Sequence, residues 1–272
     1  MLGEIPFFSI ITVCYNSGDG AADAVRHLRE QDFTDYEHII KDGGSRDGSL
    51  DRVRELVSDD GRVRVFSGAD SGIYDAMNQA LAEARGRYVF FLNCGDRFAS
   101  TDVLSRVHEF IKKCPDLGDN AVIYGDFLLR GERIRQPERL DGWYLYRRPL
   151  NHQSMFCGCG VFGRFGNFDT SFKIRADHEL TLRAFVGGAG FRRVDLVVSE
   201  YEGGGFSEKA ENRERSLSEL QNLRERHFLP LELKRFRFRE KFLFNGVRKV
   251  IRLRCPKFVR KAYRNFANWL NR

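Results

Sequence analysis

The first third of the chain alternates between short apolar runs and stretches in which apolar residues recur every three or four positions. The apolar, β-branched runs predict buried strands at residues 7–14, 36–42, 62–67 and 87–93. The periodic stretches predict helices at residues 19–31, 50–59 and 75–84. Ser49 is expected to cap the second of these helices. Such alternation is typical of a parallel sheet whose faces are covered by helices.

The alternation loosens after about residue 120, where the pattern predicts a mixed arrangement. The predicted elements here are strands at residues 120–129, 132–140 and 151–162, a helix at 176–188, and a strand followed by a glycine-rich loop within 191–207. The body of the protein is therefore expected to be an α/β half followed by a mixed half.

Four aspartates stand at positions where such a sheet would place a binding site. They are Asp42, Asp70 and Asp96, which follow predicted strands, and Asp177, which lies at the start of a predicted helix. Ligands of open α/β sheets bind outside the carboxyl ends of the strands. Carboxylates and loop glycines at such a place suit a divalent cation that carries a polyphosphate.

Each of these segments also has a purely structural interpretation. The sequence Asp42–Gly43–Gly44 is a common turn sequence. Acidic residues before the helix at 75–84 would stabilise its first turn. Asp96 could cap the next helix, although Ser100 and Asp102 are better placed to do so.

Six segments together resemble the bacterial family 2 glycosyltransferases, whose catalytic domain has the GT-A fold. The segments are SIITVCYN, KDGGSRDGS, DSGIYDAMNQA, FLNCGDRF, NHQSMF and ADHELTLR. They span roughly residues 7–207 in the order and spacing of the family, and the third is distinctive of the subgroup that builds exopolysaccharide and lipopolysaccharide. The resemblance implies an α/β, GT-A (Rossmann-like) fold with a mostly parallel sheet flanked by helices.

The resemblance implies a donor site for a nucleotide-diphosphate sugar, with a UDP-sugar as the first expectation. The residues that match this site are Thr12, Tyr15, Asp42, Asp70 and Asn93. Asp96 occupies the metal-binding position of the family's D-x-D-like element and is expected to bind Mn²⁺ or Mg²⁺. Asn93 and Gly95 replace carboxylates of a full D-x-D, so modest metal affinity is expected.

Asp177 matches the general base of the family, which takes a proton from the acceptor hydroxyl. One base and one cation suffice for a single in-line displacement that inverts the anomeric centre. The acid that usually precedes the base is replaced by Ala176, and Glu179 provides a second carboxylate nearby. His152, Gln153 and Glu179 are candidate residues on the acceptor side, although a single histidine is more often a structural residue.

Charge is distributed unevenly between the body and the tail of the chain. The formal net charge is +7, but residues 208–272 contain 19 Lys and Arg against 7 acidic residues. Residues 1–207 contain the other 26 basic and 31 acidic residues. We therefore expect a catalytic domain at residues 1–207 and a basic helical tail at 208–272.

Aromatic and basic residues are interleaved along this tail, which Pro256 divides into two segments. The pattern predicts amphipathic helices that lie on an anionic membrane. One alternative is that the aromatic residues pack on the catalytic domain. Another is nucleic-acid binding, which is not expected because no nucleic-acid-binding motif accompanies the charge.

The N-terminus and the cysteines predict a cytoplasmic protein. The first residues include Glu4 and no basic region, which is not typical of a signal peptide. No run approaches the roughly 18 uninterrupted apolar residues of a spanning helix. The six cysteines are scattered without zinc or disulfide spacing. We expect peripheral association with the inner face of the cell membrane.

The leading hypothesis is a glycosyltransferase that uses a lipid-linked or saccharide acceptor in bacterial surface polysaccharide synthesis. A metal-dependent nucleotidyltransferase would use a similar site, but it normally needs a basic, glycine-rich phosphate loop. The segment CYNSGDGAADA contains no Lys or Arg before Arg26. A non-catalytic membrane or nucleic-acid adaptor would leave Asp96 and Asp177 without a role.

Overall fold

The computed structural model describes residues 5–203 and 210–254, with residues 243–254 described by their backbone alone. Contacts between Cα atoms divide the chain into two units, Met1–Gly205 and Phe206–Arg272. Among the described residues, no helix combines the length and the apolar character needed to cross a membrane.

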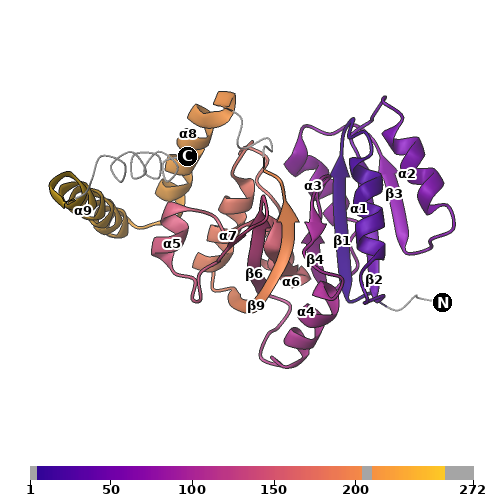
Figure 1. Cartoon of the computed structure of the whole chain (residues 1–272), viewed down its shortest axis with the longest axis horizontal. Helices are drawn as coiled ribbons and strands as arrows, with labels where there is room; N and C mark the ends of the chain where they lie inside the picture. Colours follow the sequence, from indigo (N-terminus) through magenta and orange to yellow (C-terminus); the bar gives the residue numbers. More distant parts are fainter. Residues whose placement is uncertain (1–4, 204–209, 255–272) are drawn as a thin grey trace. The chain divides into compact units, whose positions relative to one another are not determined.

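A nine-stranded sheet forms the centre of the first unit (Figure 1). Its strands are β1 (Phe8–Cys14), β2 (Tyr36–Asp42), β3 (Val63–Ser67), β4 (Tyr88–Phe91), β5 (Arg97–Phe98), β6 (Ala121–Leu129), β7 (Glu132–Ile134), β8 (Met155–Gly158) and β9 (Gly190–Tyr201). Their order is β3-β2-β1-β4-β8-β6-β9-β5, with β7 paired to β6. Strands β1 to β4 pair in parallel, whereas β8 runs antiparallel to both β4 and β6. The predicted parallel half and mixed half are both present.

Helices flank this sheet (Figure 1). They are α1 (Gly20–Arg29), α2 (Ser49–Val57), α3 (Ile73–Leu81), α4 (Val103–Lys112), α5 (Gly142–Arg147), α6 (Cys159–Phe165) and α7 (Ala176–Val186). Helices α1 and α2 pack together over β1 and β2 through a small cluster of buried apolar residues, which includes Ala22, Val25, Ile40, Val53 and Val57. Helix α3 contacts the same two strands.

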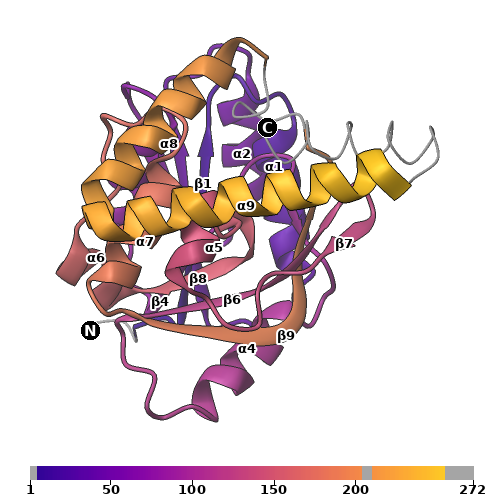
Figure 2. The ribbon, with the colours of Figure 1, turned by 90° about the vertical axis from the view of Figure 1, so that its left-hand side faces the viewer.

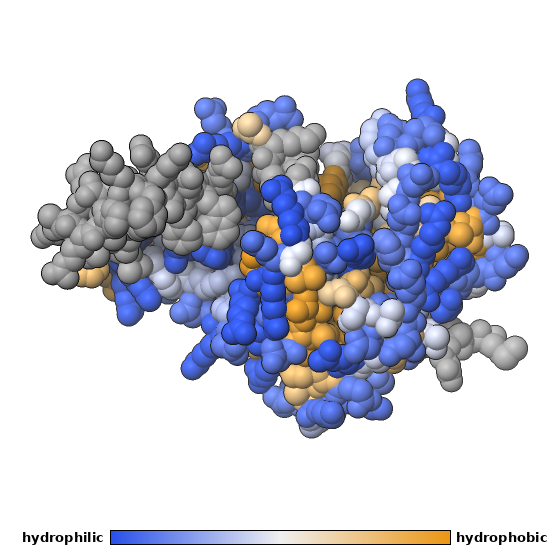
Figure 3. Space-filling model, viewed as in Figure 1, coloured by the Kyte–Doolittle hydropathy of each residue, from blue (hydrophilic) through white to orange (hydrophobic). Residues whose placement is uncertain are grey.

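Aromatic residues are the largest side chains in the larger core cluster of the first unit. Phe8, Tyr88, Phe90 and Phe156 are fully buried there, and the ring centroids of Phe90 and Phe156 lie 4.6 Å apart. Burying such a side chain stabilises the fold by roughly 1.5–3 kcal/mol. Strands β1 and β4 are buried along their whole lengths, and in β1 this includes the polar residues Ser9 and Thr12. At the surface, hydrophilic residues cover most of the face in Figure 3, and hydrophobic residues gather near its middle.

Two local predictions are corrected by the structure. Ser49 is the first residue of α2 and not its N-cap, because Gly48 takes that position with a φ of 78°. The carboxylate of Asp47 accepts hydrogen bonds from Ser49 N (3.1 Å) and Ser49 Oγ (2.6 Å), so Asp47 supplies the side-chain acceptor at the start of α2. The run at 151–162 is not one strand, since it forms a 3₁₀ turn (His152–Ser154), then β8, then α6.

The end of β4 and the start of β8 lie side by side. The two strands are antiparallel, with Tyr88 opposite Gly158 and Val89 opposite Cys157. The 3₁₀ turn before β8 therefore adjoins the loop after β4. Because β1, β2 and β3 are parallel to β4, their carboxyl ends open at this edge too.

The second unit contains α8 (Arg213–His227) and α9 (Pro230–Arg254), which Figure 2 shows as two consecutive helices. Pro230 opens α9, where a missing N–H is harmless. Glu232 accepts a hydrogen bond from Leu229 N at 2.9 Å, as in one half of a capping box. The rings of Phe228 and Phe236 meet edge to face at 5.3 Å. Residues 208–209 and 255–272 of the predicted tail, Pro256 among them, lie outside the described residues.

Candidate active site

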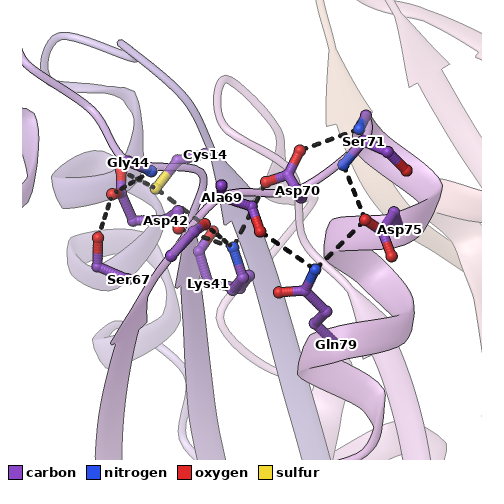
Figure 4. Close-up of polar contacts among 12 residues, drawn as sticks. Cys14, Lys41, Asp42, Gly44, Ser67, Ala69, Asp70, Ser71, Asp75 and Gln79 are labelled. Carbon is purple, nitrogen blue, oxygen red and sulfur yellow. Dashed lines mark hydrogen bonds and ion pairs between the residues drawn. The ribbon is translucent and has the colours of Figure 1, made fainter.

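Asp42 lies on the last rung of the parallel ladder, where the register places it between Cys14 and Ser67 (Figure 4). Its carboxylate is fully buried, and its Oδ2 atom accepts hydrogen bonds from Gly44 N (2.8 Å), Ser45 N (3.0 Å) and Ser67 Oγ (2.8 Å). Burial opposes ionisation, but the hydrogen bonds from Ser45, Ser67 and Gly44 outweigh it and keep the pKa of Asp42 below its ordinary value. Asp42 therefore fixes the loop that follows β2.

Gly43 brings three of the predicted donor-site residues together. A Cβ atom on Gly43 would lie 2.8 Å from Asp70 Oδ2 and 3.3 Å from Tyr15 Cδ2. Only a glycine fits there without a shift of these neighbours. The ring of Tyr15 is 67% exposed, so it offers a surface on which a flat ligand could stack. Tyr15, Asp42 and Asp70 thus meet around one glycine, as the sequence predicts for a donor site.

Lys41 holds Asp70 in place, a role that the sequence did not indicate. Its buried Nζ atom donates hydrogen bonds to the carbonyl oxygens of Asp42 (2.8 Å) and Gly68 (2.7 Å) and lies 3.4 Å from Asp70 Oδ2 (Figure 4). A buried ammonium needs such acceptors to offset its lost hydration. Asp70 Oδ1 also accepts a hydrogen bond from Gly72 N at 3.0 Å. Strand β2 and the loop after β3 are tied together by this lysine.

Thr12 lies beneath the site and not on its surface. The residue is fully buried in β1, and its Oγ1 atom donates a hydrogen bond to the carbonyl oxygen of Leu92 at 2.7 Å. Thr12 Oγ1 also lies 2.9 Å from Nε2 of the buried His38. Burial lowers the pKa of His38 to about 3, so this ring is neutral and donates to Thr12. Thr12 links the strands that carry the site.

Asn93 and Asp96 lie on the loop after β4 and carry two buried oxygen atoms with unmet hydrogen-bonding capacity. Asn93 Oδ1 and Asp96 Oδ2 have no hydrogen-bond partner among the residues that the structure describes. Burial raises the pKa of Asp96, although hydrogen bonds from Gln153 and Asn93 and the nearby His152 act in the opposite direction. A buried carboxylate of this kind needs a compensating positive charge.

These two oxygen atoms fit a divalent cation. Hard cations prefer oxygen ligands, and Mg²⁺ is usually held by one or two carboxylates together with substrate phosphates. Asp96 and Asn93 would be the protein ligands. Across residues 5–203 and 210–254, no group of three or more His, Cys, Asp and Glu side chains is placed to hold a metal ion. The remaining ligands would therefore come from the donor and from water.

Asp177 is held from two sides at the start of α7. His152 Nδ1 lies 3.1 Å from Asp177 Oδ2, and the hydroxyl of Tyr74 lies 3.2 Å from Asp177 Oδ1. His152 Nε2 lies 3.1 Å from Asn93 Nδ2, so the ring also reaches the loop after β4. Burial opposes ionisation of Asp177, but the hydrogen bond from His152 leads the contacts that outweigh it and lower the pKa of Asp177. Asp177 is therefore ionised at neutral pH, as a general base must be.

Gln153 and Glu179 occupy different surroundings from those expected. Gln153 hydrogen-bonds the carboxyl of Asp96, which places it beside the candidate cation site. Glu179 is buried and forms an ion pair of 2.8 Å with Arg183, one turn further along α7. Residues two apart on a helix point in different directions, so Glu179 does not share the surroundings of Asp177. Asp177 is the better placed base.

Tyr74 is a site residue for which the sequence analysis predicts no role. Its hydroxyl lies 2.8 Å from the carbonyl oxygen of Ile174 and 3.2 Å from Asp177 Oδ1. The residue belongs to the segment DSGIYDAMNQA, which helix capping does not explain as a whole. The sequence does show a tyrosine in the first turn of α3, but its partner Asp177 lies about a hundred residues further along the chain.

Comparisons with known proteins identify the family of this chain. The family model described as "Glycosyl transferase family 2" matches residues 9–172. The "PGL/p-HBAD biosynthesis glycosyltransferase" of Mycobacterium bovis is 30% identical over 213 residues, which cover 77% of this chain and 82% of that protein. An "Uncharacterized glycosyltransferase" of Mycobacterium tuberculosis is 34% identical over 186 residues, covering 66% of this chain and 69% of the relative.

Solved structures with GT-A folds resemble this chain in three dimensions. The mannosyltransferase PcManGT from Pyrobaculum calidifontis, in complex with GDP-Man and Mn²⁺, matches with a TM-score of 0.66 at 18% identity and covers 88% of this chain and 70% of that one. S. aureus TarS 1-349 in complex with UDP-GlcNAc matches with a TM-score of 0.61 at 20% identity and covers 73% of this chain. The match spans 59% of that TarS chain. The predicted GT-A fold is confirmed.

Proposed function

The chain belongs to glycosyltransferase family 2, and on this premise we propose that it moves a sugar from a nucleotide-diphosphate sugar to a lipid-linked or saccharide acceptor in bacterial surface polysaccharide synthesis. A UDP-sugar is the first candidate donor. Structural neighbours bound to UDP-GlcNAc and GDP-Man support a donor of this class. One observation carries the proposal. His152 contacts both Asn93, on the loop that also carries Asp96, and Asp177. Asp42 and Asp70 lie at the same edge of the sheet.

Each group has one task in the proposed reaction. Tyr15 and Asp70, beside Gly43, bind the nucleoside and the sugar of the donor, and the buried Asp42 fixes the loop between them. Asp96 and Asn93 would hold Mn²⁺ or Mg²⁺, which when bound offsets the negative charge of the diphosphate. Asp177 takes the proton from the acceptor hydroxyl.

The proposed chemistry is a single displacement. The acceptor oxygen forms a bond to the anomeric carbon while the bond to the diphosphate oxygen breaks, and the leaving group departs as a nucleoside diphosphate. Base and leaving group act on opposite faces of the sugar, so the anomeric configuration inverts. A positioned base is typically worth about 10²–10⁴-fold in rate.

The test is a thermal-shift screen of UDP-, GDP- and dTDP-sugars with Mn²⁺, followed by transfer assays with the donor that binds. A ligand that binds the native state raises the melting temperature by mass action. We expect release of nucleoside diphosphate and a product of inverted configuration in its proton NMR spectrum. Release of pyrophosphate instead would indicate a nucleotidyltransferase. If no nucleotide-sugar raises the melting temperature or is consumed, the proposed function is wrong.

We also propose that residues 1–207 form the catalytic domain of a cytoplasmic enzyme and that the basic tail, 208–272, binds the anionic inner face of the membrane. The exposed face of α9 supports this. Leu231, Phe238 and Phe242 are 78%, 72% and 69% exposed. At about 100° per residue they lie within about 40° of one another around the helix. They form one apolar stripe, whereas Leu233, on the opposite side, is buried.

Cations border this apolar stripe on both sides. By the same helical geometry, Lys234 and Lys241 lie on one side of it and Arg235 and Arg239 on the other, and all four residues are exposed. An apolar stripe between two cationic rows matches the acyl boundary and the headgroups of an anionic bilayer. Each Lys or Arg near such a surface contributes about 1 kcal/mol.

A further inference from the structure

His152 uses both of its ring nitrogens, and each contacts a different part of the candidate site. Nδ1 lies 3.1 Å from Asp177 Oδ2 at the start of α7, and Nε2 lies 3.1 Å from Asn93 Nδ2 on the loop after β4. The residue itself lies in the 3₁₀ turn before β8. One side chain therefore links the residue that would act as base with the loop that would hold the donor phosphates.

The partners determine which nitrogen of His152 carries a proton. An ionised carboxylate only accepts hydrogen bonds, so Nδ1 must be the donor to Asp177. Nε2 then accepts from the Asn93 amide nitrogen, which leaves Asn93 Oδ1 as the oxygen without a partner in the described part of the chain. The three residues thus share one consistent set of donors and acceptors, and this set turns the Asn93 oxygen away from the histidine.

The second oxygen of Asp177 is positioned independently. The Tyr74 hydroxyl has one proton and lies between Ile174 O (2.8 Å) and Asp177 Oδ1 (3.2 Å). Because the hydroxyl donates to only one acceptor at a time, its hold on Oδ1 is intermittent. His152 therefore makes the firmer of these two contacts with the carboxylate.

Packing alone does not hold the ring of His152. Its side chain is 30% exposed, and a cavity of about 20 Å³ lies beside it, lined chiefly by apolar side chains such as Phe91, Met155 and Leu180. A void of this size holds at most about one water molecule. Because the ring borders this cavity on one side and solvent on another, its two hydrogen bonds determine its orientation.

We propose that His152 is a positioning residue that keeps Asp177 and Asn93 in one fixed relation, so that the base faces the acceptor while the Asn93 oxygen is presented to the donor side. The inference rests on the proposed function, in which Asp177 is the base. His152 acts through these two residues, and in this assignment it does not bind the acceptor itself.

Two substitutions separate the two contacts. Asparagine places its amide nitrogen close to the position of histidine Nδ1, so His152→Asn keeps a donor for Asp177 and loses the contact with Asn93. Glutamine can place its amide oxygen close to the position of histidine Nε2, where it accepts from Asn93 Nδ2, so His152→Gln keeps the contact with Asn93 and loses the donor to Asp177. Both replacements are polar and similar in size to the histidine, which makes them matched variants for the two roles.

The expected kinetic results differ between these variants. His152→Gln should lower kcat by about 10- to 100-fold, as loss of an orienting partner does, with little change in KM for the donor. His152→Asn should keep most of kcat and raise KM for the donor. If kcat and KM for the donor change in the same way in both variants, or if neither variant differs from the wild-type protein, His152 has no positioning role of this kind.

An NMR measurement tests the contacts without any assay of transfer. Long-range ¹H–¹⁵N correlation spectra of the full chain at pH 8, assigned by the signals that His152→Gln removes, should show His152 with a proton on Nδ1 and none on Nε2. The opposite tautomer would overturn the proposal even if the wild-type protein transfers sugar. If the tautomer is as expected but no donor is consumed, the failure belongs to the proposed function and not to the positioning of Asp177.

Discussion

Gly43 and Asp70 approach each other so closely that a methyl group on the glycine would lie 2.8 Å from the Oδ2 atom of the aspartate. On the other side of the same glycine, the ring of Tyr15 would be 3.3 Å away. Asp70 cannot simply retreat, since Lys41 and Gly72 N both hold its carboxylate. Space for the donor at this edge therefore depends on a position with no side chain.

Gly43→Ala is expected to weaken donor binding because either Asp70 or Tyr15 must shift. We expect Kd for the nucleotide-sugar to rise about tenfold, equivalent to about 1.4 kcal/mol, in isothermal titration calorimetry. Gly61→Ala is the matched control, since a Cβ there meets nothing within 4 Å. Unchanged affinity in the Gly43 variant would place the donor elsewhere.

Asp96→Asn should separate metal binding from folding. Burial raises the pKa of Asp96, so the ionised carboxylate costs stability at neutral pH, and the neutral amide removes this cost. Without metal the variant should melt at the same temperature as the wild-type protein or higher. With Mn²⁺ and donor, only the wild-type melting temperature should rise, and transfer by the variant should be abolished.

Two outcomes would contradict a cation site at Asp96. The first is full activity of Asp96→Asn. The second is wild-type transfer that EDTA leaves unchanged together with a metal-induced thermal shift that survives the substitution. EDTA resistance alone would describe a metal-independent member of the family, so the variant and the chelator are needed together.

Asp177→Asn should leave donor binding nearly intact and lower kcat by at least about a hundredfold, because an amide cannot take the acceptor proton. The shape of the side chain and its place between His152 and Tyr74 are retained, so a folding defect is not expected. Steady-state kinetics and calorimetry measure the two effects separately. Near wild-type turnover would show that another group is the base.

Exchanging Phe238 and Phe242 together for serine should remove most binding of the full-length protein to anionic vesicles. Both rings are exposed, so little folding energy depends on them. Leu217→Ser on α8 is the matched control, since that leucine is also exposed. Co-sedimentation with phosphatidylglycerol vesicles at low and high salt measures the effect. Salt should weaken the cationic part of the attraction, which is screened over roughly 8–10 Å at physiological ionic strength.

If the wild-type protein does not bind vesicles at low salt, the apolar stripe binds a different partner. Dimerisation detected by analytical ultracentrifugation, and lost in the double variant, would assign the stripe to a second copy of the chain. Retention on heparin or single-stranded DNA without vesicle binding would favour nucleic acid.

Asp60 should make stability depend on acid pH. Its hydrogen bond with Arg62 outweighs burial and, with help from Arg29, lowers the pKa of Asp60 to about 2. Since the folded-state pKa lies below the unfolded value of about 3.9, this stabilisation is present above about pH 4 and is lost as pH falls toward 2. The arginines are about one third exposed, so the contribution is about 1–2 kcal/mol.

Urea denaturation at pH 7 and at pH 2.5 tests this assignment. Asp60→Asn should lower the free energy of unfolding at pH 7, and at pH 2.5 only about a third of that deficit should remain. The exposed neighbour, Asp59→Asn, is the control and should change little at either pH. A deficit in Asp60→Asn that is undiminished at pH 2.5 would point to packing instead of charge.

The sequence predicts the parallel half of the fold because its determinants are local. Strands rich in apolar and β-branched residues, and helices with a regular apolar period, are each recognisable within about ten residues. The placement of Asp42 at the end of β2 follows from the same pattern. Ser49 does not cap α2 because its hydroxyl donates to the Asp47 carboxylate, while the carbonyl oxygen of Gly48 accepts the hydrogen bond from Arg52 N.

Contacts between distant segments could not be predicted in this way. Tyr74 and Asp177 meet only because α3 and α7 pack near one another in the finished fold. Strand β8 lies between β4 and β6 in the sheet, and the hydrophobic periodicity of the sequence does not predict strand order. Glu179 looked equivalent to Asp177 in the sequence, but a two-residue step on a helix points it toward Arg183.

The antiparallel pairing of β8 with β4 makes the segment before β8 a spacer of fixed length. His152 lies only three residues ahead of Met155, where β8 begins, and the β4–β8 register fixes where that strand can start. One residue inserted between them would leave the sheet able to form but carry the imidazole out of reach of Asp177. The number of residues between His152 and Met155 therefore matters to the site as much as their identity.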